Sequence, residues 1–366
     1  MDIKKIAKEN VLACKPYKGG KPIDELKREM GLKNVIKIAS NESPFLPPKN
    51  VLRALEQGLS SINRYPDGDC YYLRLALSKT LKVPGNMFTF GNGSDEILVL
   101  TLMGFLKKDE EVIIAEPTFL VYKIASLIQG AKLKFVPLKN YRYDLPSMAG
   151  AATDKTKIIF IANPDNPTGS YITEKELKGF LKKIPNSIIV VLDEAYREFV
   201  CAKDYPFKTV DMVRSYPIIV MRTFSKIYSL AGIRIGYAIS DPDITDVLNR
   251  VREPFNVNNL AQIGATESLK DKKYVQKVRK FISEQKSYLY KELERLNIRF
   301  VQSQTNFILL IFDFQGKEVY DFLLKKGIIV RDMSGWGLEN CIRITVGLQQ
   351  ENRLFIKYLE EFIKNR

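Results

Sequence analysis

The chain of 366 residues contains no histidine, the side chain that most often carries acid and base catalysis near neutral pH. Any proton transfer would therefore fall to Lys, Asp, Glu, Tyr or Cys. Cysteine is scarce, and the four cysteines lie far apart without a CxxC pair. Without histidine or clustered cysteines, we expect neither a metal site nor a disulfide framework. The cysteines are Cys14, Cys70, Cys201 and Cys341.

Long apolar runs are also missing. The N-terminal segment MDIKKIAKENVLACKPYKGG has no apolar stretch of the length of a signal peptide, and the longest apolar runs elsewhere have strand length. We therefore expect a cytoplasmic protein without a membrane partner. No internal repeat or low-complexity linker occurs, and 45% hydrophobic with 27% charged residues is a balance typical of folded globular proteins.

Basic residues outnumber acidic ones by 57 to 42, which gives a net charge of +15. The lysines are spread at amphipathic spacing, as in KKDEE and KELKGFLKK, and no arginine-rich block is interleaved with aromatics. This distribution favours a solvated surface over a nucleic-acid partner, although a positive field would help an anionic small molecule to approach.

Short apolar runs alternate with helical stretches through the middle of the chain, which predicts an α/β fold with a mainly parallel central sheet. The runs are EVIIAEP, KLKFVPL, TKIIFIANP, SIIVVLDEA, PIIVMRTFS and GIRIGYAIS. Because the chain exceeds the usual size of one core, we expect a second, smaller α/β domain. The expected parts are an arm packing on the small domain (1–55), a large domain (56–258) and a small domain with its connecting helix (259–366).

Lys226 is the first candidate for chemistry. It follows a strand-like run in RTFSKIYSLAGIRIGY, beside Thr223 and Ser225, and Arg234 comes eight positions later. Burial and a nearby cation lower the pKa of an amine, as a lysine that forms a Schiff base requires. A single lysine is more often a surface residue, so this assignment depends on its neighbours.

Two further polar residues follow apolar strands. Asp193 ends SIIVVLDEA, where a buried carboxylate needs a partner such as a protonated ring nitrogen, although it could instead cap a helix. Asn166 lies in the turn NPDNPTG, where its amide could donate to a phenolate oxygen, although prolines and glycine also suit a purely structural turn. We expect Asn166, Asp193 and Lys226 to meet at one edge of the sheet.

The segment FGNGSDEILVLTLMGFL places Ser94 and Asp95 at the start of an apolar helix, where backbone N–H groups suit a phosphate. The same pattern also caps many helices that bind nothing.

In the order GNGSDE, EPTF, NPDNPTG, LDEAY and SK with an arginine eight residues on, the chain resembles the fold-type I, class I/II aminotransferases over nearly its whole length. Within them, RYPDG, REPFNVN, SNESPF, IIVRDM and CIRITVG resemble the histidinol-phosphate aminotransferase family. The resemblance implies pyridoxal 5′-phosphate (PLP) as cofactor, with catalytic roles for Lys226 as Schiff base and proton carrier, Asp193 at the ring nitrogen and Tyr196 at the phenolic oxygen. The cofactor-binding residues that it implies are Ser94, Asp95, Phe119, Asn166, Asp193, Tyr196, Thr223, Ser225, Lys226, Arg234 and, from the partner subunit of a homodimer, Tyr65.

For substrate binding, the resemblance implies Arg343 as the clamp of the amino-acid carboxylate, and Arg331 and Tyr17 at the substrate phosphate with Asn256 nearby. Without it, Tyr65 could be an ordinary turn residue and Arg343 a structural arginine.

The function implied is transamination of L-histidinol phosphate with 2-oxoglutarate, which gives imidazole acetol phosphate and glutamate in histidine biosynthesis. Two alternatives stay open, an aromatic amino-acid aminotransferase and a PLP-dependent decarboxylase of a phosphorylated amino acid. The decarboxylase would use the same cofactor residues, because the reaction type depends on which Cα bond stands perpendicular to the ring.

Overall fold

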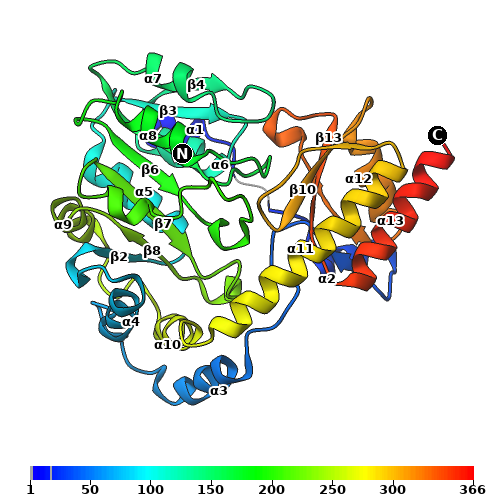
Figure 1. Cartoon of the computed structure of the whole chain (residues 1–366), viewed down its shortest axis with the longest axis horizontal. Helices are drawn as coiled ribbons and strands as arrows, with labels where there is room; N and C mark the ends of the chain where they lie inside the picture. Colours follow the sequence, from blue (N-terminus) through cyan, green and yellow to red (C-terminus); the bar gives the residue numbers. More distant parts are fainter. Residues whose placement is uncertain (1–2, 17–18) are drawn as a thin grey trace.

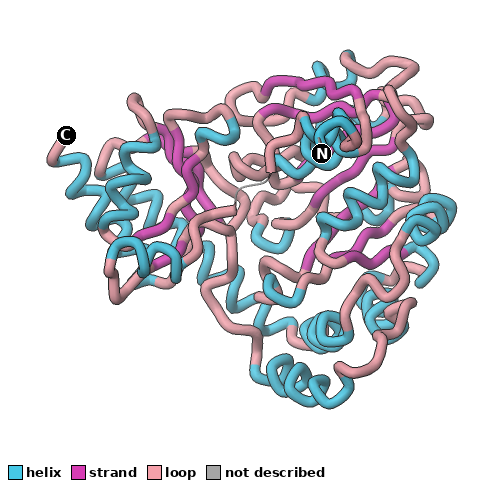
Figure 2. The backbone as a smooth tube through the Cα atoms, turned by 180° about the vertical axis from the view of Figure 1, so that it is seen from behind, coloured by secondary structure: helices cyan, strands magenta, loops and turns pink. Residues whose placement is uncertain are grey.

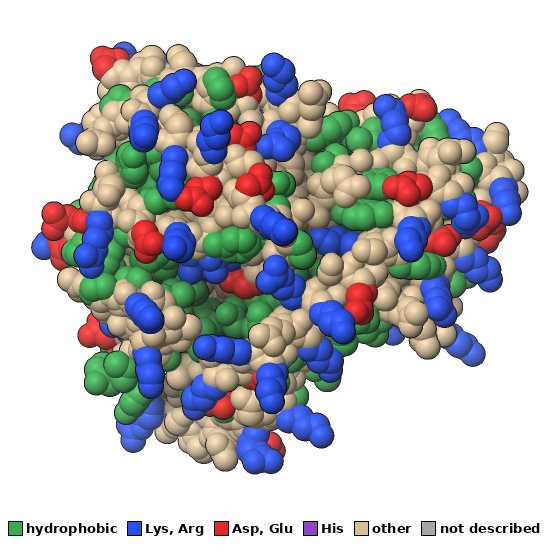
Figure 3. Space-filling view, viewed as in Figure 1, with side chains coloured by type: hydrophobic (Ala, Val, Ile, Leu, Met, Phe, Trp, Pro, Cys, Tyr) green, Lys and Arg blue, Asp and Glu red, His purple; other side chains and the backbone are tan. Residues whose placement is uncertain are grey.

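The computed structural model describes residues 3–16 and 19–366, and it has a larger and a smaller α/β part bridged by the long helix α11 (Lys272–Arg295) (Figure 1). Lysine and arginine side chains are scattered over the face seen in Figure 3, among acidic and apolar ones. No helix of the described segments is long and apolar enough to cross a membrane.

The larger part contains a seven-stranded sheet with the order β2-β8-β7-β6-β5-β3-β4. Strands β4, β3, β5, β6 and β7 are parallel, and β8 runs antiparallel to both of its neighbours. The predicted mainly parallel α/β sheet is therefore confirmed. The strands are β2 (Phe88–Gly91), β3 (Glu111–Glu116), β4 (Lys132–Pro137), β5 (Thr156–Ala162), β6 (Ile189–Asp193), β7 (Ile218–Thr223) and β8 (Gly236–Ile239).

Helices cover both faces of this sheet, which explains why its strands are continuously apolar. Along β5, Ile158 and Phe160 face one core, whereas Ile159 and Ile161 face the other. The first face packs against α5 (Ser94–Phe105), α6 (Leu120–Ile128) and α9 (Pro242–Val251). The second face packs against α3 (Lys49–Gly58), α4 (Tyr71–Leu81), α7 (Leu145–Gly150), α8 (Glu174–Leu181) and α10 (Asn259–Ser268).

The smaller part is an antiparallel sheet of order β12-β13-β10-β9 with its own core. The view from behind places this sheet toward the larger part, with helices on its outer side (Figure 2). A two-stranded parallel sheet pairs β1 with β11. The elements are β1 (Ile36–Lys37), β9 (Arg299–Phe300), β10 (Phe307–Ile311), α12 (Gly316–Lys325), β11 (Ile328–Ile329), β12 (Arg331–Asp332), β13 (Cys341–Thr345) and α13 (Gln349–Lys364).

The N-terminal segment contacts both parts. In α1 (Glu9–Leu12), the Nδ2 of Asn10 donates to two carbonyls at the end of α6, at 2.8 and 2.9 Å. In α2 (Ile23–Met30), Leu26 packs against Leu324 and Ile329 of the smaller part. The small domain was predicted to begin at residue 259. Helix α10 instead contributes Ala261 to the core of the larger part, so the change from one core to the other falls between α10 and α11.

Candidate active site

A cavity of about 310 Å³ lies between the carboxyl ends of β5, β6 and β7 and the strands β12 and β13. Twelve of the fifteen residues predicted for the site line it, although they are far apart in the sequence. The sheet edge and the smaller part therefore enclose one candidate active site. The twelve are Ser94, Asp95, Phe119, Asn166, Asp193, Tyr196, Thr223, Ser225, Lys226, Arg234, Arg331 and Arg343.

Lys226 lies three residues past the end of β7, on a turn in which the backbone N–H of Ser225 donates to Thr223 Oγ1 at 3.0 Å. Burial, together with the guanidinium of Arg343, lowers the pKa of Lys226 to about 8. Its Nζ lies 5.6 Å from the ring centroid of Tyr196. An amine with this pKa is partly neutral near pH 7 and can act as a nucleophile and a base.

Asp193 ends β6 with its carboxylate buried. It accepts hydrogen bonds from the hydroxyl of Tyr122 at 2.7 Å and from the N–H of Ala195 at 3.0 Å. Burial nevertheless raises the pKa of Asp193 to about 6, and no described side chain forms an ion pair with it. A protonated ring nitrogen would be a fitting partner, because its positive charge would compensate the negative charge of the Asp193 carboxylate, which is buried away from water.

The start of α5 forms a concave anion site opposite Arg234. Gly93 has φ +83°, and a Cβ there would collide with the guanidinium of Arg234, which lies 3.5 Å from Asp95. Helix α5 begins at Ser94 without a side-chain cap, so its first N–H groups are available to a ligand. A Cβ on Gly236 would collide with the backbone N of Ser94, so both glycines are needed for this close approach.

Asn166 and Tyr196 follow the neighbouring strands β5 and β6, and each is held by a residue from outside the larger sheet. The Oδ1 of Asn166 accepts from Nη1 of Arg343, which leaves its NH₂ group for another acceptor. The hydroxyl of Tyr196 accepts from Asn41 Nδ2 at 2.9 Å, and burial raises the pKa of Tyr196 to about 12. Tyr196 therefore stays protonated and can donate to an oxygen in the cavity.

Two arginines form the wall from the smaller part. Arg331 on β12 and Arg343 on β13 are register partners in an antiparallel pair, so their side chains lie on the same face of the sheet. Arg343 also donates from Nη2 to the carbonyl of Ala39 at 3.1 Å, and its guanidinium lies 5.0 Å from the ring centroid of Phe307. Two adjacent cations at a cavity suit a ligand with one strongly negative group.

Three predicted residues do not line the cavity. Tyr65 is 83% exposed and stacks on Phe255, with 4.8 Å between ring centroids. Asn256 donates to Glu96 at 2.7 Å and to the carbonyl of Phe90 at 3.1 Å, and this contact holds the beginning of α5. Tyr17 lies outside the described residues.

The residues that line the cavity but were missed by the sequence interpretation include Asn41, Tyr122 and Trp336. Tyr122 follows Phe119 by three positions, a helical spacing that places both on one side of α6. Trp336 is the only tryptophan of the chain and comes five residues after Arg331. Asn41 lies in SNESPF, a segment that contributes to the family resemblance but to which no site role was assigned.

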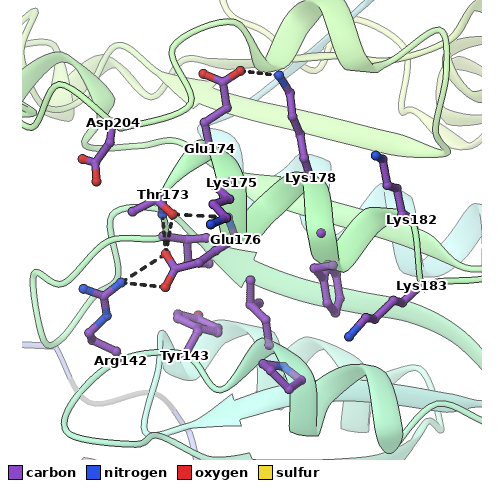
Figure 4. A pocket seen from close by; sticks show the side chains of 15 residues that line it. Arg142, Tyr143, Thr173, Glu174, Lys175, Glu176, Lys178, Lys182, Lys183 and Asp204 are labelled. Atoms are coloured by element: carbon purple, nitrogen blue, oxygen red, sulfur yellow. Dashed lines mark hydrogen bonds and ion pairs between the residues drawn. The ribbon is translucent and has the colours of Figure 1, made fainter.

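A larger cavity, of about 1270 Å³, lies along α8 and contains none of the predicted residues (Figure 4). Two ion pairs lie within it, Arg142 with Glu176 at 3.1 Å and Lys178 with Glu174. Thr173 and Glu176 form the capping box of α8. These groups are satisfied by the helix and its surroundings, so they do not point to chemistry on a ligand.

The family model described as aminotransferase class I and II matches residues 33–359, and the chain belongs to this family. It is 44% identical to a histidinol-phosphate aminotransferase from Moorella thermoacetica over 97% of this chain and 92% of the relative. One from Caldicellulosiruptor saccharolyticus is 40% identical, with 97% and 99% covered. The structure of the histidinol-phosphate aminotransferase from Sinorhizobium meliloti with pyridoxal-5′-phosphate superposes with a TM-score of 0.90 at 26% identity, covering 98% and 97%. The fold-type I architecture predicted from the motifs is confirmed.

Proposed function

We propose that this aminotransferase uses PLP to transfer the amino group of L-histidinol phosphate to 2-oxoglutarate, which gives imidazole acetol phosphate and glutamate. We assign the reaction to histidine biosynthesis in the cytoplasm. The observation that carries the proposal is one cavity in which a buried lysine of lowered pKa faces two register-paired arginines. The relatives named above are histidinol-phosphate aminotransferases at 40–44% identity over nearly their full length, which favours the same substrate.

The residues of the larger part fit the cofactor. The N-terminus of α5, with Ser94, Ser225 and Arg234, is suited to the cofactor phosphate, and Asp193 to the ring nitrogen. Asn166 and Tyr196 both keep a hydrogen-bond donor for the phenolic oxygen. When bound, the cofactor supplies a conjugated ring that takes up the electron pair left by breaking a bond at the substrate carbon.

Lys226 is the group that we assign to both attachment and proton transfer. Its Nζ would hold the cofactor and, once released, take the proton from the amine-bearing carbon of the substrate. The pKa of about 8 suits this base, since a general base works best with a pKa near the working pH. The chain has no histidine that could share this role.

The arginine pair is the feature that we assign to substrate choice. Histidinol phosphate has a phosphate-bearing CH₂ group where an amino acid has its carboxylate. Arg343 and Arg331 lie opposite each other in β13 and β12, so one phosphate could contact both guanidinium groups. The same pair could hold a carboxylate of glutamate or of 2-oxoglutarate in the second half-reaction.

We further propose a homodimer in which Tyr65 reaches the partner's cofactor phosphate. A set of exposed apolar side chains, close to Tyr65 in the sequence or stacked on it, is of a kind that marks a protein interface. It includes Leu59, Ile62, Tyr65, Tyr71, Tyr72, Leu75 and Phe255. The molar mass in solution, compared between the native chain and Tyr72→Glu, would test the dimer.

The test of the reaction is a panel of donors with 2-oxoglutarate: histidinol phosphate, histidinol, phenylalanine and O-phosphothreonine. We expect glutamate release to be fastest with histidinol phosphate. Equal rates with phenylalanine would favour the aromatic alternative, and carbon dioxide release from phosphothreonine without glutamate would favour a decarboxylase.

The test of the cofactor site compares two buried lysines, because Lys286 also has a pKa of about 8 but donates to the carbonyl of Ser303 at 2.8 Å outside the cavity. Lys226→Ala is expected to abolish the visible absorption of the cofactor-loaded protein and its activity. Lys286→Ala should retain both. Loss of the absorption in Lys286→Ala alone would contradict the assignment of Lys226.

A further inference from the structure

Trp336 lies beside Arg331 in a well-defined turn. It ends a short 3₁₀ helix, Ser334–Trp336, that follows β12 directly. Both the N–H and the hydroxyl of Ser334 donate to Oδ1 of Asp332, at 3.1 and 2.7 Å, and the N–H of Trp336 donates to the carbonyl of Met333 at 2.9 Å. These bonds hold the backbone of Trp336 in place, and its side chain packs in a buried apolar cluster with Leu309 and Met333.

The indole ring contacts the guanidinium of Arg331. The Cζ of Arg331 lies 4.8 Å from the ring centroid of Trp336, which is 7% exposed, and both residues line the candidate active site. Tryptophan has the most favourable aromatic face for a cation, and the contact strengthens when water is excluded. A flexible arginine side chain is thus held by a fixed aromatic surface.

The indole nitrogen gives a second reason to assign a role to this ring. The Nε1 of Trp336 is buried and has no hydrogen-bond partner among the described residues. An unpaired buried N–H costs free energy. A phenylalanine or leucine would fill much of the same apolar space, among Leu309, Ile311 and Met333, without this cost. The contact with Arg331 offers a gain that those side chains provide weakly or not at all.

We propose that Trp336 is a positioning residue that orients the guanidinium of Arg331 toward the anionic group of the substrate. This inference rests on the proposed function, since it assumes that Arg331 binds that group. Trp336 acts through Arg331, and its loss should weaken recognition of a phosphorylated substrate more than turnover.

The main test is steady-state kinetics of the PLP-loaded enzyme with Trp336→Leu and Trp336→Phe, using histidinol phosphate and unphosphorylated histidinol. Trp336→Leu should raise KM for histidinol phosphate on the order of tenfold and Trp336→Phe about threefold, both with kcat within about twofold of the native value. KM for histidinol should change by less than about twofold. The control is Tyr171→Leu, which removes the ring under Arg142 at 5.7 Å, outside this cavity, and should leave both KM values unchanged.

The outcomes separate this inference from the proposed function. If Arg331→Ala raises KM for histidinol phosphate but Trp336→Leu does not, the inference is wrong and the proposed function stands. An equal rise of KM for both substrates in Trp336→Leu would mean a merely structural role and would also overturn it. If Arg331→Ala itself leaves KM unchanged, both fail.

A second measurement needs no variant of Trp336 and observes the indole directly. Because Trp336 is the only tryptophan, the intrinsic fluorescence of the cofactor-free protein reports on this indole. Titration with inorganic phosphate should change the emission of the native chain, and Arg331→Ala should abolish the change. Unchanged native emission at phosphate concentrations that inhibit the enzyme competitively would overturn the inference.

Discussion

The two walls of the active-site cavity are built differently. In the wall from the larger part, Asp193 and Lys226 follow neighbouring parallel strands, and burial shifts the pKa of each. In the wall from the smaller part, Arg331 and Arg343 face each other across an antiparallel pair. The first wall holds groups whose protonation can change, whereas the second holds permanent cations. We infer that the first wall performs the chemistry and the second selects the substrate.

Hydrogen bonds of Arg343 join these walls. Arg343 on β13 donates to Asn166, which follows β5, and to the carbonyl of Ala39 in the N-terminal segment. The arginine that we assign to substrate binding therefore also orients an amide that we assign to the cofactor. Changes in the second wall should affect mainly binding, with a smaller effect on the first wall through Asn166.

The largest effect is expected from Asp193→Asn in the cofactor-loaded enzyme. Without a negative charge at the ring nitrogen, kcat should fall by about 10²–10³-fold, the usual loss when a preorganised electrostatic partner is removed. The control is Asp165→Asn, because burial also raises the pKa of Asp165 to about 6, yet this residue does not line the cavity. Single-turnover rates should separate the two variants. An equal fall in both would mean that the lower kcat follows from replacing any buried carboxylate and not from a specific role of Asp193.

A smaller effect, on binding, is expected from Arg343→Lys. A lysine cannot form the paired contacts of a guanidinium, so KM for histidinol phosphate and for glutamate should rise by about 10–100-fold. The fall in kcat should be much smaller. Arg299→Lys serves as control, since Arg299 pairs with Asp313 in the same part of the molecule but outside the cavity. A loss confined to kcat would contradict the division of roles between the walls.

The first wall could be predicted from the sequence better than the second. Polar residues that follow buried parallel strands must lie at one sheet edge, and Asn166, Asp193 and Lys226 do so. The antiparallel direction of β8 was not predicted, although residues 224–235 contain only a short 3₁₀ helix and are a poor crossover between parallel strands.

Contacts between distant segments gave no signal in the sequence. The bond from Tyr122 to Asp193 depends on how α6 packs on the sheet, and even the contact of Trp336 with Arg331, only five residues away, depends on the conformation of the turn between them. The positions of Tyr65 and Asn256 relative to the cavity likewise depend on packing. In the proposed homodimer, the position of Tyr65 also depends on the second subunit. Local pattern cannot supply this information.

The smallest effect concerns the pH dependence of stability, and it compares Lys226 in the first wall with Lys286, which lies in neither wall. Burial lowers the pKa of both from 10.5 to about 8. Between pH 8 and 10.5 the unfolded chain binds more protons than the folded one. Each lysine therefore destabilises the cofactor-free protein at pH 7, and this penalty disappears as the pH rises through that window.

Lys226→Met should therefore raise the free energy of unfolding at pH 7 by about 1–2 kcal/mol, and by much less at pH 10. Lys286→Met should gain less, because it leaves the carbonyl of Ser303 without its donor. Urea denaturation at both pH values would measure this, and a gain that grows with pH would show that Lys226 is not buried as an uncompensated amine.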